Sequence, residues 1–334
     1  MSKPAIKSLP ATYLVKLGKF VWTSMWRVMM SQLAPPDSRG AYIRPPSQFR
    51  QRISQEPEAE YPPAANRYCL YVGMGCPWAH RTLVVRALKG LEDVIEVRLV
   101  YPSAEQGIWI LAQPSPEGLT TLPQIYQLAK PGYQGRCTVP VLWDKVSKTI
   151  VNNESAEIIE ILNSEFNQFA TNADLDLYPE TLKPDIDKWN EKIYHTVNNG
   201  VYRCGFAQTQ TAYEQACSEL FNTLAEIEVA LEKQRYLCGP KITLADVRLF
   251  TTLFRFDIVY YSLFKCNIRR IQDYCFLSEY LRDIYQLPNV ANTCDLETVK
   301  RDYYGNLFPL NPGGIIPLGP QLDLSLPHQR DKFN

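Results

Sequence analysis

Histidine is scarce in this chain of 334 residues, and neither sign of charge is in excess. The chain has three histidines, and no pair of its cysteines has zinc-finger spacing, so we expect no structural metal site. The 35 basic and 35 acidic residues cancel, which argues against a general attraction for nucleic acid and leaves only a local patch open. The sequence therefore predicts neither a resident metal nor a nucleic-acid partner.

A regular cysteine framework is also missing. The nine cysteines are odd in number and irregularly spaced, whereas small secreted domains usually carry an even number at close spacing. We therefore expect a reduced, cytoplasmic chain in which most cysteines are small buried hydrophobic residues.

No long apolar run is free of charge. Lys16, Lys19 and Arg27 interrupt the hydrophobic residues near the N-terminus, which makes a poor membrane span. No small-residue cleavage site follows, so a signal peptide is not expected. Apolar residues do recur there at helical spacing and predict an amphipathic helix: Leu14, Leu17, Val21, Met25 and Val28. Such helices mostly pack on their own protein or on a partner. Because the opposite face of this helix is basic, binding to a membrane surface is the alternative.

The next part of the chain alternates between strand and helix patterns. After a Pro-rich arm at residues 34–67, the sequence predicts a strand over 67–74, a helix over 76–90 and a strand over 94–100, which implies a parallel pair with a right-handed crossover. Residues 101–136 are expected to form loop with one helix near 123–129. A hairpin over 138–152 and a helix over 154–166 follow. This order is that of a thioredoxin-like domain.

From residue 184 onward the patterns are almost all helical, over 185–199, 210–233, 244–264 and 276–286. Thr243 and Asp246 form a capping box at the start of the third of these helices. We predict an N-terminal helix and arm over 1–66, a thioredoxin-like domain over 67–168, an all-helical domain over 184–320 and a tail over 321–334.

Cys76 is the strongest candidate for chemistry. It follows a predicted strand and begins a predicted helix, with Pro77 fitted to the first helical turn. The unpaired N–H groups and positive potential of a helix N-terminus stabilise a thiolate, and cysteines placed this way often have a lowered pKa. Ala79 stands where a redox Cys-x-x-Cys motif would have its second cysteine. An outside thiol must therefore resolve a disulfide on Cys76, and glutathione is the natural one in a reducing cell.

Two further pairs suit a peptide ligand of this kind. Pro140 follows Val139 at the start of a predicted strand, where thioredoxin-like folds have a cis-proline that leaves the preceding backbone free; an ordinary trans proline is the alternative. Glu154 and Ser155 open a predicted helix, whose N–H groups can bind a carboxylate while Glu154 holds an ammonium. An ordinary acidic first turn is the alternative.

Longer motifs resemble those of the glutathionyl-hydroquinone reductases, the xi class of glutathione transferases. The resemblance runs from about Phe49 to Pro320 and rests on CPWAHRT at 76–82, LKGL at 88–91, TVPVLWDK at 138–145, TIVNNES at 149–155, NNGVYRCGF at 198–206, FRFDI at 254–258, FKC at 264–266, LNP at 310–312 and PLGP at 317–320.

The resemblance implies a glutathione transferase fold, usually as a homodimer, with Cys76 as nucleophile. It assigns glutathione binding to the region 67–168, and substrate binding and dimerisation to the region 184–320. It implies that glutathione lies near Trp109, Val139, Pro140, Glu154 and Ser155, and that the aromatic substrate lies beside Tyr202, Tyr260 and Tyr303. The implied reaction reduces a glutathionyl-hydroquinone to the hydroquinone and releases glutathione disulfide through a mixed disulfide on Cys76.

One departure and two alternatives accompany this expectation. Where the family commonly has histidines around the C-terminal Tyr-Tyr pair, this chain has Asp302 and Asn306. An omega-like thioltransferase or dehydroascorbate reductase would use the same cysteine and glutathione. A non-catalytic binding protein on this fold is the other alternative, and only the N-terminal helix supports it.

Overall fold

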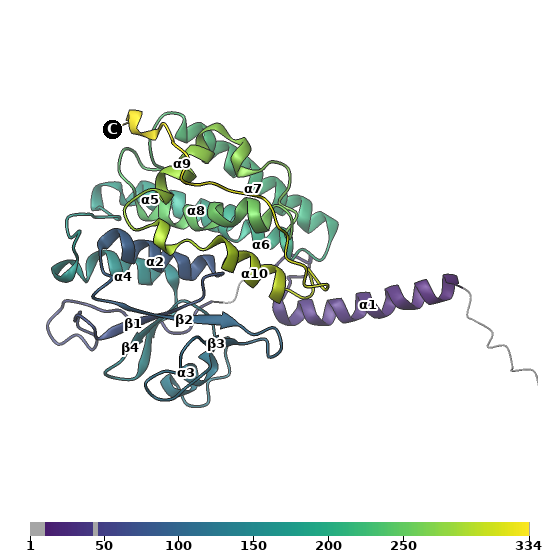
Figure 1. Ribbon diagram of the computed structural model, residues 1–334, viewed down its shortest axis with the longest axis horizontal. Coiled ribbons are helices and arrows are strands. Elements are labelled where there is room, and N and C mark those ends of the chain that lie inside the picture. Colours follow the sequence, from purple (N-terminus) through teal and green to yellow (C-terminus); the bar gives the residue numbers. More distant parts are fainter. Residues whose placement is uncertain (1–10, 43–45, 334) are drawn as a thin grey trace, which may run out of the picture.

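The computed structural model describes residues 11–42 and 46–333. A five-stranded sheet forms the lower part of the molecule in Figure 1, and a bundle of helices forms the upper part. Helix α1 (Ala11–Leu33) projects from one side of this body, and residues 34–67 connect it to the sheet without a regular helix or strand among those described. The predicted N-terminal helix and irregular arm are confirmed.

The sheet follows a β-α-β unit and a later hairpin. Its strands are β1 (Tyr68–Val72), β2 (Glu96–Pro102), β3 (Trp109–Leu111), β4 (Val141–Asp144) and β5 (Thr149–Asn152), in the order β3-β2-β1-β4-β5. The β1 strand runs parallel to β2 with Leu70 opposite Val97, and antiparallel to β4 with Leu70 opposite Leu142. All five residues of β1 are buried, as expected for a central strand covered on both faces.

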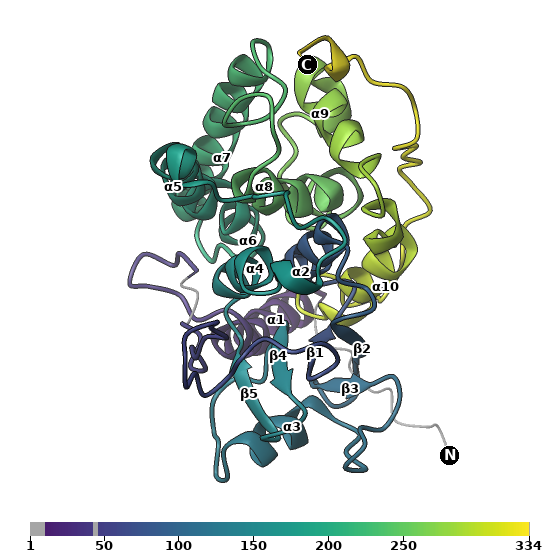
Figure 2. The same cartoon turned by 90° about the vertical axis from the view of Figure 1, so that its left-hand side faces the viewer.

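Helices cover both faces of the sheet (Figure 2). On the upper face α2 (Pro77–Lys89) packs against α4 (Ser155–Ser164), and α3 (Leu122–Ala129) lies below. Gly90 ends α2 in the left-handed conformation, at φ 63°, where a glycine avoids the Cβ clash. The thioredoxin-like arrangement predicted from the order of elements is confirmed.

The upper part is all helical. It contains α5 (Lys183–Ile193), α6 (Gly200–Gly205), α7 (Gln210–Leu231), α8 (Leu244–Arg255), α9 (Cys275–Tyr285) and α10 (Leu296–Asn306). Short turns of 3-10 helix lie at Asn167–Phe169, Glu180–Leu182, Ile271–Asp273, Ala291–Thr293 and Arg330–Phe333, and wider π-helical turns at Tyr194–Asn198 and Phe256–Tyr260. The α8 helix packs on α2, which joins the two parts. The glutathione transferase fold is therefore confirmed.

The structure adds elements that the sequence did not predict. The three-residue strand β3 is too short to give a period, and it forms because Tyr101 of β2 pairs with Ile110. The six-residue α6 is held by packing on α7. The α10 helix is rich in polar residues, and Asp295 caps it by accepting the Thr298 N–H at 2.9 Å. None of the helices described within 11–42 and 46–333 is long and apolar enough to cross a bilayer.

Candidate functional site

Cys76 occupies the junction between β1 and α2. It is the residue before the helix, with extended backbone (φ −79°, ψ 118°), and Pro77 takes the first helical position. The thiol is partly exposed, and its Sγ lies 3.6 Å from the carbonyl oxygen of Val139. The Val139–Pro140 peptide bond is cis. The free N–H groups at the start of α2 point to the same end of the helix as the thiol, which favours its anionic form.

The loop before Cys76 is held by two side chains of the helical part. Arg255, at the end of α8, is 1% exposed and donates from Nε to the Gly75 carbonyl at 2.9 Å and from Nη2 to the Met74 carbonyl at 2.8 Å. Asp302, on α10, accepts the Gly75 N–H at Oδ2 over 3.1 Å. The Gly75 peptide is thus fixed at both its donor and its acceptor, immediately before the nucleophile.

Two glycines allow this close packing. A Cβ atom at Gly75 would lie 2.6 Å from Asp302 Oδ2, and one at Gly73 would lie 2.4 Å from the Trp109 ring. Both separations are well below van der Waals contact, so a larger residue at either position would displace a wall of the site. The glycines of the Gly-Met-Gly-Cys stretch therefore allow Asp302 and Trp109 to pack closely against the backbone before Cys76.

His80 supports Arg255 from inside the protein. Its Nδ1 lies 2.9 Å from Arg255 Nη1 and its Nε2 lies 2.9 Å from the Thr293 hydroxyl, which itself donates to the Val290 carbonyl. These partners assign the proton to Nε2. Burial, followed by the adjacent guanidinium, lowers the pKa of His80 well below its usual value. His80 is therefore a neutral structural partner of Arg255.

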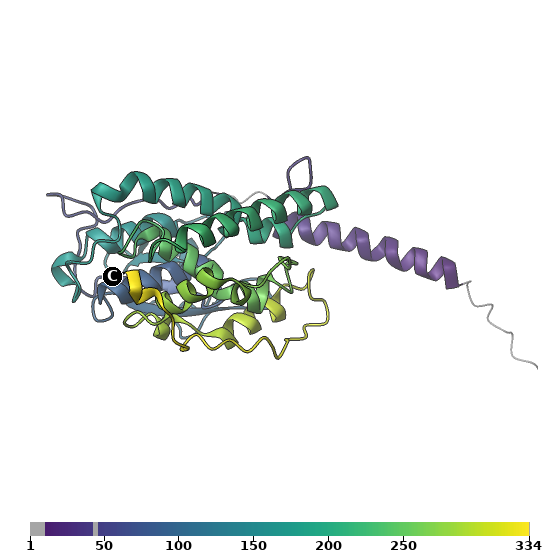
Figure 3. The ribbon, with the colours of Figure 1, turned by 90° about the horizontal axis from the view of Figure 1, so that it is seen from above.

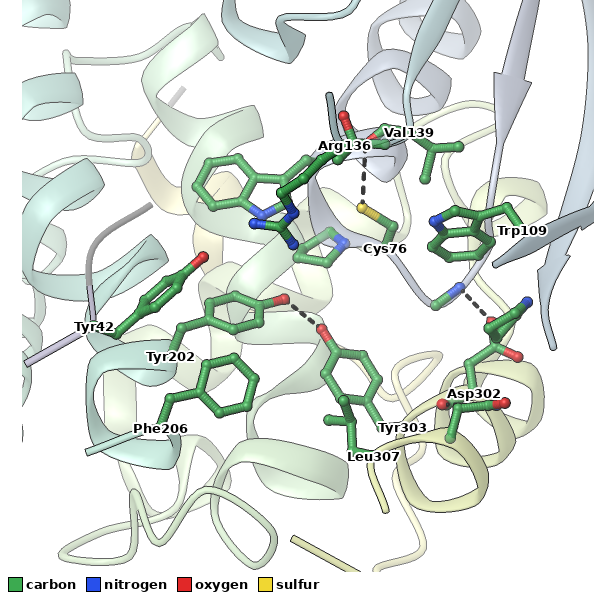
Figure 4. A pocket seen from close by; sticks show the side chains of 16 residues that line it. Tyr42, Cys76, Trp109, Arg136, Val139, Tyr202, Phe206, Asp302, Tyr303 and Leu307 are labelled. Carbon is green, nitrogen blue, oxygen red and sulfur yellow. Dashed lines mark hydrogen bonds between the residues drawn. The ribbon is translucent and has the colours of Figure 1, made fainter. Parts of the chain in front are cut away.

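A cavity of about 260 Å³ opens beside Cys76 (Figure 4). Both parts of the molecule line it, with Trp109 and Val139 on the thioredoxin-like side and Tyr202, Phe206 and Tyr303 on the helical side. Its remaining lining residues are Tyr42, Gly75, Pro77, Trp78, Pro102, Arg136, Thr138, Asp302, Asn306 and Leu307. Aromatic and aliphatic walls around a thiol and a few polar atoms suit an aromatic molecule that carries polar substituents.

Three tyrosine hydroxyls form a connected group at the helical side of the cavity. The Tyr303 Oη lies 2.6 Å from that of Tyr202 and 3.0 Å from that of Tyr260. Burial raises the pKa of all three, well above the usual value for Tyr202 and Tyr303, so they remain protonated donors at neutral pH. Tyr202 and Tyr303 line the cavity, while the fully buried Tyr260 lies behind them and does not line it.

Glu154 and Ser155 lie at the N-terminus of α4, outside the wall of this cavity. The Glu154 carboxylate accepts the Ala156 N–H at 3.1 Å and the Ser47 hydroxyl at 2.9 Å. The buried Ser155 hydroxyl lies 3.4 Å from Arg81 Nη1. Of the predicted glutathione residues, Trp109 and Val139 line the cavity at the Cys76 thiol. Pro140, Glu154 and Ser155 do not line it.

A second cavity connects these two regions. It measures about 400 Å³, is lined by Ser47 and Asn153 next to Glu154, and shares Arg136 and Thr138 with the cavity at Cys76. Arg136 is exposed, and its side chain makes no hydrogen bond or ion pair with the residues at 11–42 and 46–333. A cation at the border of the two cavities is suited to a carboxylate ligand.

Sequence reasoning missed Arg136, Arg255, Phe206 and Tyr42 as site residues. Arg255 and Phe206 belong to motifs of the family resemblance. No local sequence pattern indicated that the Arg255 side chain binds the loop before Cys76 or that Phe206 lines the cavity. Tyr42 comes from the arm, which showed no periodic pattern. Asp302 was noticed only as a departure from the family, and the structure brings it to the residue before Cys76.

The expectation about the other cysteines was only half right. All nine are free, but of the eight besides Cys76 four are buried, three are partly buried and Cys275 is exposed. Burial raises the pKa of Cys69 and of Cys294 to about 12, which keeps both as thiols. Within the described part of the chain, no cluster of three or more His, Cys, Asp or Glu side chains could hold a metal ion.

Comparison with known proteins agrees with the geometry. Family models described as "Glutathione S-transferase, N-terminal domain" and "Glutathione S-transferase, C-terminal domain" match residues 75–165 and 210–283. The chain is 48% identical to the glutathionyl-hydroquinone reductase YqjG of Escherichia coli over 80% of this chain and 83% of that protein. It is 44% identical to the glutathionyl-hydroquinone reductase PcpF of Sphingobium chlorophenolicum, over 90% and 94%.

Solved structures of the same family superpose on this chain. The glutathione-bound structure of E. coli YqjG superposes with a TM-score of 0.79 at 45% identity, over 85% of this chain and 96% of that one. The xi glutathione transferase of Phanerochaete chrysosporium superposes with a TM-score of 0.83 at 44% identity, over 88% and 97%. The chain belongs to the glutathionyl-hydroquinone reductases, the xi class of the glutathione transferase family.

Proposed function

We propose that the protein reduces glutathionyl-hydroquinones to hydroquinones and releases glutathione disulfide. The observation that carries this proposal is the position of the Cys76 thiol. It lies at the N-terminus of α2 and lines an aromatic cavity together with Tyr202 and Tyr303. Ala79 lies where a resolving cysteine would stand, so the second thiol comes from glutathione.

The glutathione part of the substrate binds on the thioredoxin-like side. Its cysteine lies between Trp109 and the Val139 backbone, close to Cys76. Its two charged ends use the groups that border the second cavity, a carboxylate at Arg136 and the amino acid end at the N-terminus of α4 with Glu154 and Ser155. Ser47 of the arm belongs to this region because it donates to the Glu154 carboxylate.

In the first step the Cys76 thiolate attacks the sulfur of the glutathionyl-hydroquinone. A Cys76–glutathione disulfide forms as the bond between that sulfur and the ring carbon breaks, and the ring carbon keeps the electron pair. It takes a proton, which Tyr202 or Tyr303 supplies or relays because their hydroxyls are protonated and line the cavity. Tyr260 orients the Tyr303 hydroxyl from behind.

In the second step a free glutathione thiolate attacks the mixed disulfide. Glutathione disulfide leaves, and the Cys76 thiolate returns with the same charge as at the start. The hydroquinone gains the two electrons that two glutathione sulfurs lose, so no further reductant is needed.

We also propose that the protein acts as a homodimer in the cytoplasm. Light scattering would test the dimer, and cell fractionation would test the location.

The test is turnover with a glutathionyl-hydroquinone and excess glutathione, followed as hydroquinone and glutathione disulfide formed. Parent protein should form both in equal amounts, and Cys76→Ser should form neither. Turnover that survives in Cys76→Ser would overturn the thiolate mechanism. If the parent is inactive here but reduces mixed disulfides or dehydroascorbate with glutathione, the omega-like alternative is correct.

A further inference from the structure

Most of helix α1 does not pack against any other described part of the chain. Among the described residues, only its last two turns meet the body of the molecule, where Met30 is fully buried and Trp26 is partly buried. Before that point the helix extends beyond every other helix of the molecule (Figures 1 and 3). Apolar side chains along α1 are 46–71% exposed, and all of them except Val28 precede the last two turns: Tyr13, Leu14, Val15, Leu17, Phe20, Val21, Trp22, Met25 and Val28.

The exposed residues are sorted by type around the helix. At about 100° per residue, most of the apolar residues share one broad arc, while Lys16, Lys19 and Arg27 fall within about 80° of one another on the opposite side. Trp22 and Trp26 are one turn apart and stand at the border next to Lys19. An apolar face, a basic face and tryptophans between them are typical of helices that lie in the surface of a bilayer.

The charge of this region differs from that of the rest of the protein. The chain as a whole is neutral, with 35 basic and 35 acidic residues. Its first acidic residue is Asp37, whereas Lys3, Lys7, Lys16, Lys19 and Arg27 all precede it. A second copy of α1 would offer these cations no carboxylate, but an anionic lipid surface offers both negative charge and an apolar layer.

We propose that α1 binds flat on the surface of an anionic phospholipid bilayer. The apolar arc enters the boundary between head groups and acyl chains, and Lys16, Lys19 and Arg27 face the lipid phosphates. The helix does not cross the bilayer, because no helix in the described ranges is apolar enough to do so. The inference is independent of the reaction at Cys76.

The experiment is co-sedimentation of the full chain with vesicles of phosphatidylcholine alone or mixed with phosphatidylglycerol, at low and high salt. The parent should bind the anionic vesicles at low salt and far less at high salt. Changing Lys16, Lys19 and Arg27 together to Glu should weaken binding at least about a hundredfold, since each basic residue near the surface contributes about fivefold. A variant with Leu17, Val21 and Met25 changed to Ser should lose binding as well.

A control with the same change in charge is available elsewhere. Lys188, Lys233 and Lys241 are exposed on the helical part, and their joint change to Glu should leave vesicle binding within about twofold of the parent value. The proposal is overturned if the parent does not sediment with anionic vesicles, or if binding ignores lipid charge, salt and the α1 changes. It is also overturned if the Ser variant dissociates a dimer in light scattering while vesicles bind neither protein, because the occupant is then a second copy.

Discussion

The Asp302 carboxylate accepts the Gly75 N–H over 3.1 Å, one residue before the nucleophilic Cys76. This bond joins α10 to the loop of the thioredoxin-like part, next to the two bonds from Arg255 to the same loop. Burial raises the pKa of Asp302 to about 6, and the hydrogen bond from the Gly75 N–H and the nearby Arg301 and Arg255 only partly oppose this rise. An acid that titrates near neutrality therefore lies beside the thiol.

We predict that Asp302→Asn makes Cys76 more reactive above pH 6. Asn keeps an acceptor for the Gly75 N–H but removes the negative charge, which disfavours the thiolate once Asp302 ionises. Rates of alkylation by iodoacetamide should match below about pH 6, where Asp302 is neutral, and diverge above it. Equal rates at all pH values would show that the carboxylate does not act on the thiol.

The raised pKa of Asp302 also determines how this group changes the stability of the folded protein with pH. The folded protein keeps the Asp302 proton up to about pH 6, whereas an unfolded aspartate releases it near pH 4. The folded state therefore binds more protons between these values, and this group's contribution to stability falls as pH rises through the window and is constant above it. In urea titrations the parent should lose more stability than Asp302→Asn between pH 4 and 6.

Tyr303→Phe should slow release of the hydroquinone. Loss of this hydroxyl removes the central member of the tyrosine group, and a positioned proton donor typically contributes at least about a hundredfold to a rate. Attack by glutathione on a preformed Cys76 mixed disulfide should be unaffected. Tyr304→Phe is the matched control, because its hydroxyl donates to the Ile258 carbonyl and does not line the cavity.

Arg136→Ala should raise the KM for glutathione about tenfold and leave kcat within about twofold, since a charge-assisted hydrogen bond contributes about 1.5–3 kcal/mol. Arg136→Lys should restore part of the affinity because it keeps the charge. The control is Lys130→Ala, an exposed cation six positions earlier that lines neither cavity. An unchanged KM in Arg136→Ala would exclude a contact with a glutathione carboxylate.

Asp246→Ala should lower the free energy of unfolding by about 2–4 kcal/mol, because it leaves several buried donors unpaired. The carboxylate accepts the Thr243 N–H at 2.8 Å, the Leu237 N–H at 2.9 Å and the Tyr280 hydroxyl at 2.8 Å. The exposed cap Asp295 is the comparison, and Asp295→Ala should cost about 1 kcal/mol. Urea unfolding of both variants measures the difference, and similar losses would contradict the account.

The sequence predicted the elements that carry local signals. Cys76, Pro77 and Gly90 mark the two ends of α2 by their backbone chemistry, and the capping box marked α8. Even so, the predicted helices over 185–199 and 244–264 contain π-helical turns that periodicity does not reveal. The second of these turns carries Tyr260, consistent with the frequent occurrence of such turns at functional sites.

The rest of the site depends on contacts between distant residues. Asp302 and Gly75 are 227 positions apart, and Arg255 and Gly75 are 180 apart, so no spacing rule connects them. Glu154 was predicted to hold an ammonium group, and the sequence did not reveal that its carboxylate also accepts hydrogen bonds from Ser47 of the arm and from Ala156. Only the packed structure decides which polar groups face the cavity.

The most direct test of the central claim is a single turnover without free glutathione. Parent protein is mixed with one equivalent of a glutathionyl-hydroquinone, quenched in acid, and analysed by intact and peptide mass spectrometry. The account predicts one equivalent of hydroquinone and one glutathione in disulfide linkage to Cys76, which added glutathione then removes as glutathione disulfide. Release of hydroquinone with Cys76 left unmodified would contradict it.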